Sequence, residues 1–455
     1  MATEHKPLFN PLYLKALILI LPILIVLLAS LGPKAVSYPD IEHSETHPLY
    51  WIEQPDRPDN ELRLLLPAAV ALDPEQRILQ QTLAMLLQQR LHQPALQSLL
   101  TPVPHTQVTA LPDHLQISLR WPAGEKLPEL DAVLQALQQT PESDSAAATL
   151  ARIRAQAYLD GQDPAQRLLN RLQQQLQQPT QRARTSAISA ADVLQQYHRL
   201  FSQPPLQILG GPDAAKLAEQ LDAAAPGTRD GAGMFASAVT AEHSEPGHQP
   251  ERHDATPPQP VKLQLSDARL PAMYLLGASM PGRDAKDYAA QLLAIRSLQR
   301  ALELRPDTAG YYRLVWQQSR DSGYRALILA GQPTRAQTLP AEAQRTAAPP
   351  ADERVAGSSV IDSAVFDSAL IDTAVISAQL IDDTRQQLLL QLREQLQTPQ
   401  GQLDQLATLA FNNLPGQRLD TILDQLQAVP GDDIGPRIAH YLAPETQILI
   451  TLNGQ

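Results

Sequence analysis

The order of the predicted elements indicates an α+β fold in two tandem domains, each with an antiparallel-rich sheet flanked by helices. Residues 272–280 form an apolar strand, residues 287–304 a helix with one broad apolar face, and residues 311–316 and 323–330 two further strands. A related succession of elements begins at Glu61. Hydrophobic residues make up 43% of the chain and charged residues 18%, which is typical of a globular protein.

The length, net charge and cysteine content of the chain narrow its possible functions. A chain of 455 residues is too long for one core and predicts two to three domains. The net charge of −12 disfavours a nucleic-acid partner, because no basic patch is present to neutralise phosphates. The absence of cysteine excludes disulfides, thiolate catalysis and cysteine-based metal sites.

The N-terminal residues 1–33 predict a cytoplasmic tip followed by a transmembrane signal anchor. The apolar run from Ala16 to Leu31 is just long enough to span a bilayer. Lys6 and Lys15 precede it, so the N-terminus is expected in the cytoplasm and the bulk of the chain outside. A cleavable signal peptide is the alternative, with residues 35–37 as the cleavage site.

Residues 34–59 are rich in proline and charge and are interpreted as a tether; the first domain covers 60–224. Its first strand, 62–70, leads to a helix that starts at the N-cap Asp73 and ends near Leu91. The next strand, His114 to Trp121, alternates between apolar and polar residues and is expected to be half-buried.

The rest of the first domain is mainly helical. Ser189 and Asp192 form a capping box at the start of one helix. The other predicted elements are helices over 128–138, 145–159, 164–177 and 213–221 and a strand over 206–209. Residues 225–260 have no periodicity and are interpreted as a disordered linker; its histidines His243, His248 and His253 are solvated rather than metal ligands.

The second domain, 261–455, repeats the first with an insertion. Gln89-Arg90 corresponds to Gln299-Arg300 at an offset of 210, and Gln207 to Gln447 at an offset of 240. The difference predicts an insertion of about thirty residues, which we place in the low-complexity segment at about 333–376. A five-residue tandem fills its end and continues to Thr384, with the units VIDSA, VFDSA, LIDTA, VISAQ and LIDDT.

The segment LPAMYLLGASMPGRDAKDYAAQLLAIRSLQRALELRPDTAGYYRLVWQQSRDSGYRALILAG resembles the insulinase/pitrilysin family of zinc peptidases, in its non-zinc second domain. In that family an arginine at the end of a helix is followed, seven residues later, by a tyrosine on the next strand. Arg305 and Tyr312 hold this spacing, so the resemblance implies that both bind the substrate backbone. The alternative is structural, with Arg305 at the helix dipole and Tyr312 packed against its neighbours.

The same resemblance implies that this chain lacks the zinc site. The family carries H-x-x-E-H on a helix, whereas the helix over 73–91 contains no histidine, and His92 stands alone at its end. The motif His43-Ser44-Glu45-Thr46-His47 has the wrong spacing and no helical periodicity, so we do not expect it to bind metal. His198 is expected at the surface or half-buried on its helix, and not as a metal ligand. We therefore expect no cofactor in this chain, and zinc in a partner subunit.

Two functions follow from the resemblance. The first is a catalytically inactive, membrane-anchored subunit in the bacterial inner membrane that faces the periplasm. It binds extended peptide or unfolded protein and complements a separate zinc-bearing subunit as a heterodimer. The second is a purely structural or peptide-holding scaffold. An unrelated enzyme class finds no motif, since no phosphate-binding loop and no G-x-S-x-G elbow is present.

Overall fold

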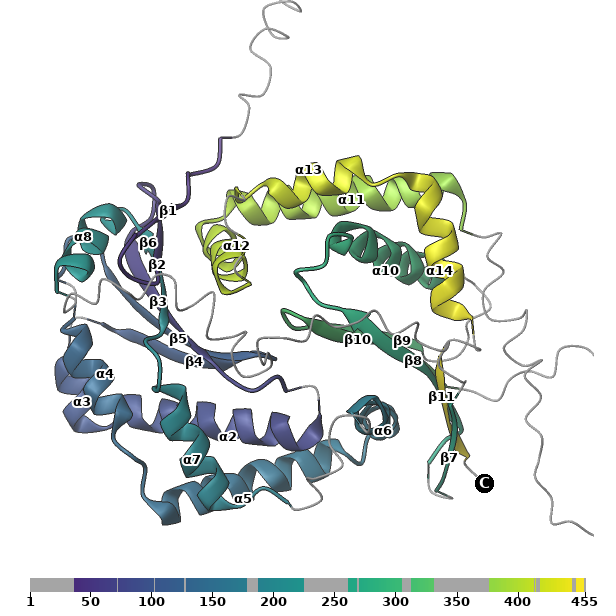
Figure 1. Ribbon diagram of the computed structural model, residues 1–455, viewed down its shortest axis with the longest axis horizontal. Helices are drawn as coiled ribbons and strands as arrows, with labels where there is room; N and C mark the ends of the chain where they lie inside the picture. The colour runs from purple at the N-terminus through teal and green to yellow at the C-terminus, as the bar shows by residue number, and fades with distance from the viewer. Residues whose placement is uncertain are drawn as a thin grey trace, which may run out of the picture. The chain divides into compact units, whose positions relative to one another are not determined.

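Two β-sheets organise the computed structural model, and their strand order is the same apart from the additional edge strand β1 of the first (Figure 1). The first has the order β1-β2-β6-β3-β5-β4 and the second the order β7-β11-β8-β10-β9. In the first sheet β1 to β6 span Glu42–His43, Leu49–Glu53, Asp59–Pro67, His105–Ala110, His114–Pro122 and Leu206–Gly211. In the second, β7 to β11 span Val261–Ser266, Met273–Pro281, Tyr312–Gln318, Ser322–Ala330 and Ile448–Asn453.

The strand directions repeat as well as the order. β2 runs parallel to β6, and β7 runs parallel to β11, while every other pair of neighbours is antiparallel. Each central strand is followed by a helix and then by an antiparallel hairpin. The two sheets are therefore built from the same succession of elements, and the α+β class that the sequence predicts is confirmed.

The structure describes three stretches of the chain. They are residues 37–224 except 72, 102, 127 and 178–186; residues 261–330 except 268–269 and 305–311; and residues 376–453 except 413, 415–417 and 444–446. Residues from Asp40 onward belong to one compact unit. We call residues 40–224 the first half and residues 261–453 the second half.

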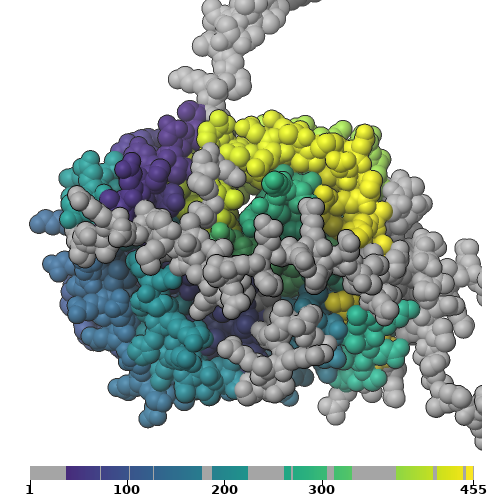
Figure 2. Space-filling view, viewed as in Figure 1, coloured from purple at the N-terminus to yellow at the C-terminus, as the bar shows by residue number. Residues whose placement is uncertain are grey.

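Helices cover both sheets. In the first half they are α2 Pro74–Leu91, α3 Pro94–Leu99, α4 Leu130–Gln138, α5 Ser143–Asp160, α6 Pro164–Gln177, α7 Ala190–Leu200 and α8 Ala214–Ala224. In the second they are α10 Tyr288–Glu303, α11 Ala378–Gln397, α12 Pro399–Phe411, α13 Thr421–Ala428 and α14 Ile434–Leu442. In the space-filling view the yellow helices α13 and α14 form a continuous band of the surface (Figure 2).

The N-terminal caps explain where two helices begin. The Asp73 carboxylate accepts a hydrogen bond from the Gln76 amide, and Pro74 occupies the first turn of α2. At α7 the Ser189 hydroxyl and the Asp192 carboxylate form the predicted reciprocal capping box.

The tether predicted over 34–59 is wrong for residues 49–53, which form β2. Leu49 and Ile52 are fully buried, and β2 pairs in parallel with β6, which lies far along the chain. The apolar run of β2 is short and does not alternate, so its pattern is compatible with a buried strand without requiring one, and the pairing with β6 defines it. The predicted transmembrane segment, linker and tandem units up to residue 375 lie outside the described residues. Among the residues that are described, no helix is long and apolar enough to cross a membrane.

The first sheet buries one apolar face under its own helices. Leu115, Ile117, Leu119 and Trp121 alternate along β5 and are all fully buried, as the period of two predicts. They join Leu62, Leu64 and Leu66 of β3 and the inner face of α2 in one core.

The opposite faces of the sheets are covered by helices exchanged between the halves. α6, from the first half, packs against β8 and β11 of the second sheet, and α12, from the second half, packs against β6 and β2 of the first (Figure 1). α6 buries Leu168, Leu169 and Leu172 in a core with Leu275, Ala326 and Ile450. We call α6 and α12 the exchanged helices.

A glycine on the receiving strand makes room for each exchanged helix. A Cβ atom built on Gly277 of β8 would lie 2.5 Å from Leu172 Cδ2 of α6. A Cβ atom built on Gly210 of β6 would lie 2.5 Å from Leu403 Cδ2 of α12. Leu172 and Leu403 are both fully buried, so the same leucine-on-glycine packing occurs at both contacts.

A buried ionic network joins α12 to the first half. Arg63 Nε donates to Glu61 Oε1 at 2.8 Å, and Arg63 Nη1 lies 2.7 Å from Asp404 Oδ1 of α12. Arg57 and Arg120 also contact Glu61, at 2.5 and 3.0 Å. Burial alone raises the pKa of Glu61, but the charges and hydrogen bonds of Arg63 and Arg57 outweigh it, so this pKa is lowered.

The contact of α6 with the second half also includes polar groups, among them the ion pair of Arg167 with Asp267 at 2.5 Å. Gln173 Nε2 donates to the Tyr324 hydroxyl at 2.7 Å, and that hydroxyl donates to Gln317 Oε1 at 2.9 Å. Arg77 of α2 donates to Gln173 Oε1 at 2.9 Å, so the chain of hydrogen bonds runs from α2 through α6 to β9.

We expect Gly277→Val to lower the free energy of unfolding by about 1–3 kcal/mol, because the new side chain overlaps Leu172. Chemical denaturation measures the change. Gly435→Ala is the control, since a Cβ atom there meets nothing within 4 Å, and it should be neutral or slightly stabilising. Gly277→Ala combined with Leu172→Ala should cost less than the sum of the single changes, and strict additivity would contradict the contact.

Glu61→Gln should lower the free energy of unfolding by about 3–5 kcal/mol at pH 7, because it leaves buried arginines without their carboxylate. The lowered pKa of Glu61 means that its stabilisation is present above its unfolded pKa and is lost as the pH falls through its folded pKa. Denaturation at pH 7 and pH 4 should therefore show a smaller acid destabilisation in the variant. The exposed Asp424→Asn should change stability by no more than about 0.5 kcal/mol.

Candidate functional site

Tyr312 is the first residue of β9, which is one edge strand of the second sheet; β7 is the other. It is half-buried and lies opposite Leu329 of β10. Its side chain shares a sheet face with Trp316, four residues on, whose ring stacks on Tyr288 of α10 at a centroid distance of 5.9 Å. Tyr312 therefore points to the α10 side of the sheet. Arg305 lies outside the described residues, so its pairing with Tyr312 stays a prediction.

α2 is the helix on which the family resemblance places the zinc motif. In place of zinc ligands this helix carries apolar side chains, and Leu83, Leu86 and Leu87 are buried in the core of the first half. Near its end, Gln88 Oε1 accepts a hydrogen bond of 2.7 Å from the backbone amide of Val108, on the edge strand β4. Gln88 thus closes the gap between this helix and the edge of the first sheet.

Two of the histidines considered from the sequence, His92 and His198, have structural contacts. His92 is exposed, and its Nδ1 lies 2.7 Å from the Gln88 backbone oxygen. His198 is exposed, with Nε2 2.9 Å from the Thr140 hydroxyl. His243, His248 and His253 lie outside the described residues. Over the described stretches, no group of three or more histidine, aspartate or glutamate side chains could hold a metal ion.

The turn from His43 to His47 fixes α8 to the N-terminal hairpin. The hydroxyls of Ser44 and Thr46 donate to Asp222 Oδ1 at 2.5 and 2.8 Å, and His47 Nε2 lies 3.8 Å from the same oxygen. The Ser44 hydrogen bond, and then that of Thr46, lowers the pKa of Asp222. The Asp222 carboxylate thus binds the polar side chains of the turn, so the residues from His43 to His47 have a structural role in holding α8.

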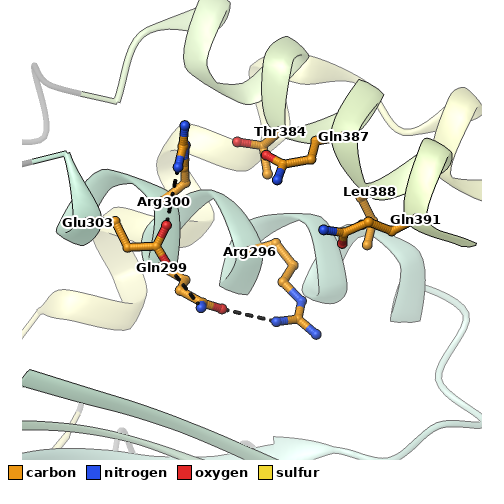
Figure 3. Close-up of a pocket in the computed structure, with 8 residues that line it drawn as sticks. All are labelled: Arg296, Gln299, Arg300, Glu303, Thr384, Gln387, Leu388 and Gln391. Atoms are coloured by element: carbon orange, nitrogen blue, oxygen red, sulfur yellow. Dashed lines mark hydrogen bonds and ion pairs between the residues drawn. The ribbon is translucent and has the colours of Figure 1, made fainter.

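A polar pocket of ≈ 150 Å³ lies between α10 and α11 (Figure 3). Within it, Gln299 lies between Arg296 and Glu303: its Oε1 accepts from Arg296 at 3.0 Å, and its Nε2 donates to Glu303 at 3.1 Å. The lining residues are Arg296, Gln299, Arg300, Glu303, Thr384, Gln387, Leu388 and Gln391.

The two equivalent helices, α2 and α10, align at an offset of 211 residues. Gln80 and Leu87 of α2 are buried, as are Gln291 and Leu298 of α10, at the corresponding positions. The offset of 210 predicted from the sequence is wrong by one residue, because it places the exposed Arg296 where Leu86 is buried. At the correct offset Gln299 is the counterpart of Gln88.

Sequence reasoning missed Gln88 and Gln299, although the repeat contains the signal that identifies them. The same residue type occupies the same helical position in both halves, yet its contacts differ. Gln88 bonds the edge strand beside it, whereas Gln299 bonds two side chains of its own helix.

Comparisons with known proteins identify the fold. No family model matches the sequence, and no curated protein matches it. A solved structure described as a peptidase M16 inactive domain from Pseudomonas fluorescens is similar over 91% of this chain and 98% of that one, with a TM-score of 0.57 and 15% identity.

Two longer proteins match this chain over about half of their length. The periplasmic protease PqqL from Escherichia coli is similar over 92% of this chain and 48% of its own, with a TM-score of 0.51 and 12% identity. A mutant of the ferredoxin protease FusC in complex with Arabidopsis ferredoxin is similar over 93% of this chain and 47% of its own, with a TM-score of 0.54 and 17% identity. The chain therefore has the fold of M16-like peptidase domains, which confirms the resemblance to the insulinase/pitrilysin family at the level of the fold.

Proposed function

We propose that this chain is a membrane-anchored, catalytically inactive homologue of the insulinase family that binds extended peptide and complements a separate zinc-bearing subunit in the periplasm. One observation carries the proposal. The helix expected to hold zinc is packed by leucines and closed against the edge strand by Gln88, in a fold otherwise shared with M16-like peptidase domains.

The chemistry of α2 supports an inactive role. A catalytic zinc site needs about three protein ligands and a base that activates water. The helix has one acidic residue, Glu75 in its first turn, and no histidine. The zinc and the water-activating base would come from the partner subunit. This chain would supply a peptide-binding fold and side chains that donate hydrogen bonds to the peptide backbone.

Three further elements of the proposal have support of their own. The apolar run before Leu31 and the two lysines ahead of it support an anchor with the bulk of the chain in the periplasm. The description of PqqL as a periplasmic protease agrees with that compartment. The ferredoxin complex of FusC supports a protein or peptide as the bound partner.

Purified alone, the chain should bind no stoichiometric zinc and cleave no peptide, because α2 offers no ligand set. Elemental analysis after dialysis against zinc and a fluorogenic peptide assay test this. Addition of the zinc-bearing partner should produce proteolysis that neither chain shows alone. Proteolysis by this chain with tight zinc would contradict the proposal, and an unchanged rate on mixing would favour the purely scaffolding function.

In that mixed assay, Arg305→Ala or Tyr312→Phe should lower turnover more than about tenfold if each side chain donates to the transition state. Tyr158→Phe is the matched control, because Tyr158 is 70% exposed on α5, far along the chain from either residue. Unchanged turnover in the Arg305 and Tyr312 variants would remove their proposed role while leaving the inactive fold assignment intact.

A further inference from the structure

The strand β4, at the hairpin edge of the first sheet, presents backbone groups outward at alternate residues. The Leu111 amide donates to the His114 oxygen at 2.9 Å, which closes the β4–β5 hairpin. Counting back from this pair, the residues whose amide and carbonyl point away from β5 are Thr106, Val108 and Ala110. The hydrogen bond from Val108 to Gln88 confirms this alternation and occupies the middle donor.

The strand β9, at the hairpin edge of the second sheet, has the same alternation. The Ser319 amide donates to the Ser322 oxygen at 2.7 Å, so the outward residues of β9 are Tyr312, Leu314, Trp316 and Gln318. The position of the Gln317 oxygen agrees: it lies 2.5 Å from a Cβ atom built on Gly323, and so points inward to β10. Trp316 is the counterpart of Val108, at an offset of 208.

The helix beside β9 leaves these groups uncapped. α2 packs along β4 as well as on α5, whereas α10 packs mainly on α11, α13 and α14. Gln299 is the counterpart of Gln88, and both polar atoms of its side-chain amide form hydrogen bonds, one with Arg296 and one with Glu303 (Figure 3). Within the described stretches, no side chain bonds the outward amides of Leu314 and Trp316.

We propose that an extended peptide adds to the second sheet as a further strand along β9, and that the first sheet is closed to the same pairing by Gln88. This inference rests on the proposed function, because it names where the peptide of that function binds. The two halves share one fold, and the direction of one glutamine side chain distinguishes their edges.

The geometry selects an extended polypeptide. The outward groups of β9 recur every second residue, about 6.8 Å apart, which is the repeat of a neighbouring strand. Main-chain pairing supplies affinity in such complexes, and side chains at alternate positions supply preference. Tyr312 lies beside the first outward pair, so a peptide on this edge would also lie next to the residue that the family resemblance assigns to substrate.

Hydrogen–deuterium exchange of the full chain, with and without reduced, carboxymethylated α-lactalbumin as the unfolded probe, tests the proposal. The probe should slow exchange in residues 312–318 and leave residues 105–110 unchanged. Leu314→Pro removes an outward amide without removing a bond to β10, and should weaken binding at least about tenfold. Thr106→Pro is the matched control on the other edge and should bind as the parent does.

The possible outcomes separate the inference from the proposed function. Binding with protection at 105–110 or elsewhere, or equal binding by Leu314→Pro, overturns the β9 site and leaves peptide binding in place. No binding to any part of the chain contradicts both. Protection of 312–318 without probe, together with dimers in sedimentation, would show that a second copy occupies the edge. If Leu314→Pro does not fold, the location of protection in the parent protein decides.

Discussion

The reciprocal packing of α6 and α12 is the constraint on which the rest of the structure depends. Each helix belongs to one half in sequence and buries its apolar face on the sheet of the other half. A strand glycine admits each helix, Gly277 beneath Leu172 and Gly210 beneath Leu403. Burying several leucines at each contact stabilises the pair of halves by far more than any surface ion pair could.

This exchange limits where a ligand can bind. One face of each sheet carries the helices of its own half, and the other face carries the exchanged helix. The edges of the sheets remain as the backbone surfaces at which a peptide can pair. On β4 of the first sheet, Gln88 accepts a hydrogen bond from the Val108 amide, which a bound peptide would otherwise use. Beside β9 of the second sheet, Gln299 bonds a side chain of its own helix instead. The equivalent edges β4 and β9 of the two sheets thus differ because the equivalent residues Gln88 and Gln299 make different contacts.

The sequence predicts the local elements well because their signals are local. The alternation along β5, the capping box at Ser189 and the limits of α6 all follow from patterns within a few residues. β2 escaped prediction because its identity depends on pairing with β6, more than 150 residues later. The exchange of α6 and α12 escaped for the same reason, since an apolar helix face does not specify which sheet it covers.

The candidate site was predictable only in part. The spacing of Arg305 and Tyr312 and the missing zinc ligands are visible in the sequence. The position of Tyr312 on an edge strand could be known only from the sheet order.

Unfolding measured by the fluorescence of a single tryptophan tests the central constraint most directly. The variant W51F/W121F retains Trp316 in the second sheet, and W121F/W316F retains Trp51 in the first. Coincident fluorescence and circular-dichroism transitions in both variants are predicted, because neither half can unfold without exposing its exchanged helix. Two separated transitions, one for each tryptophan, would contradict the account.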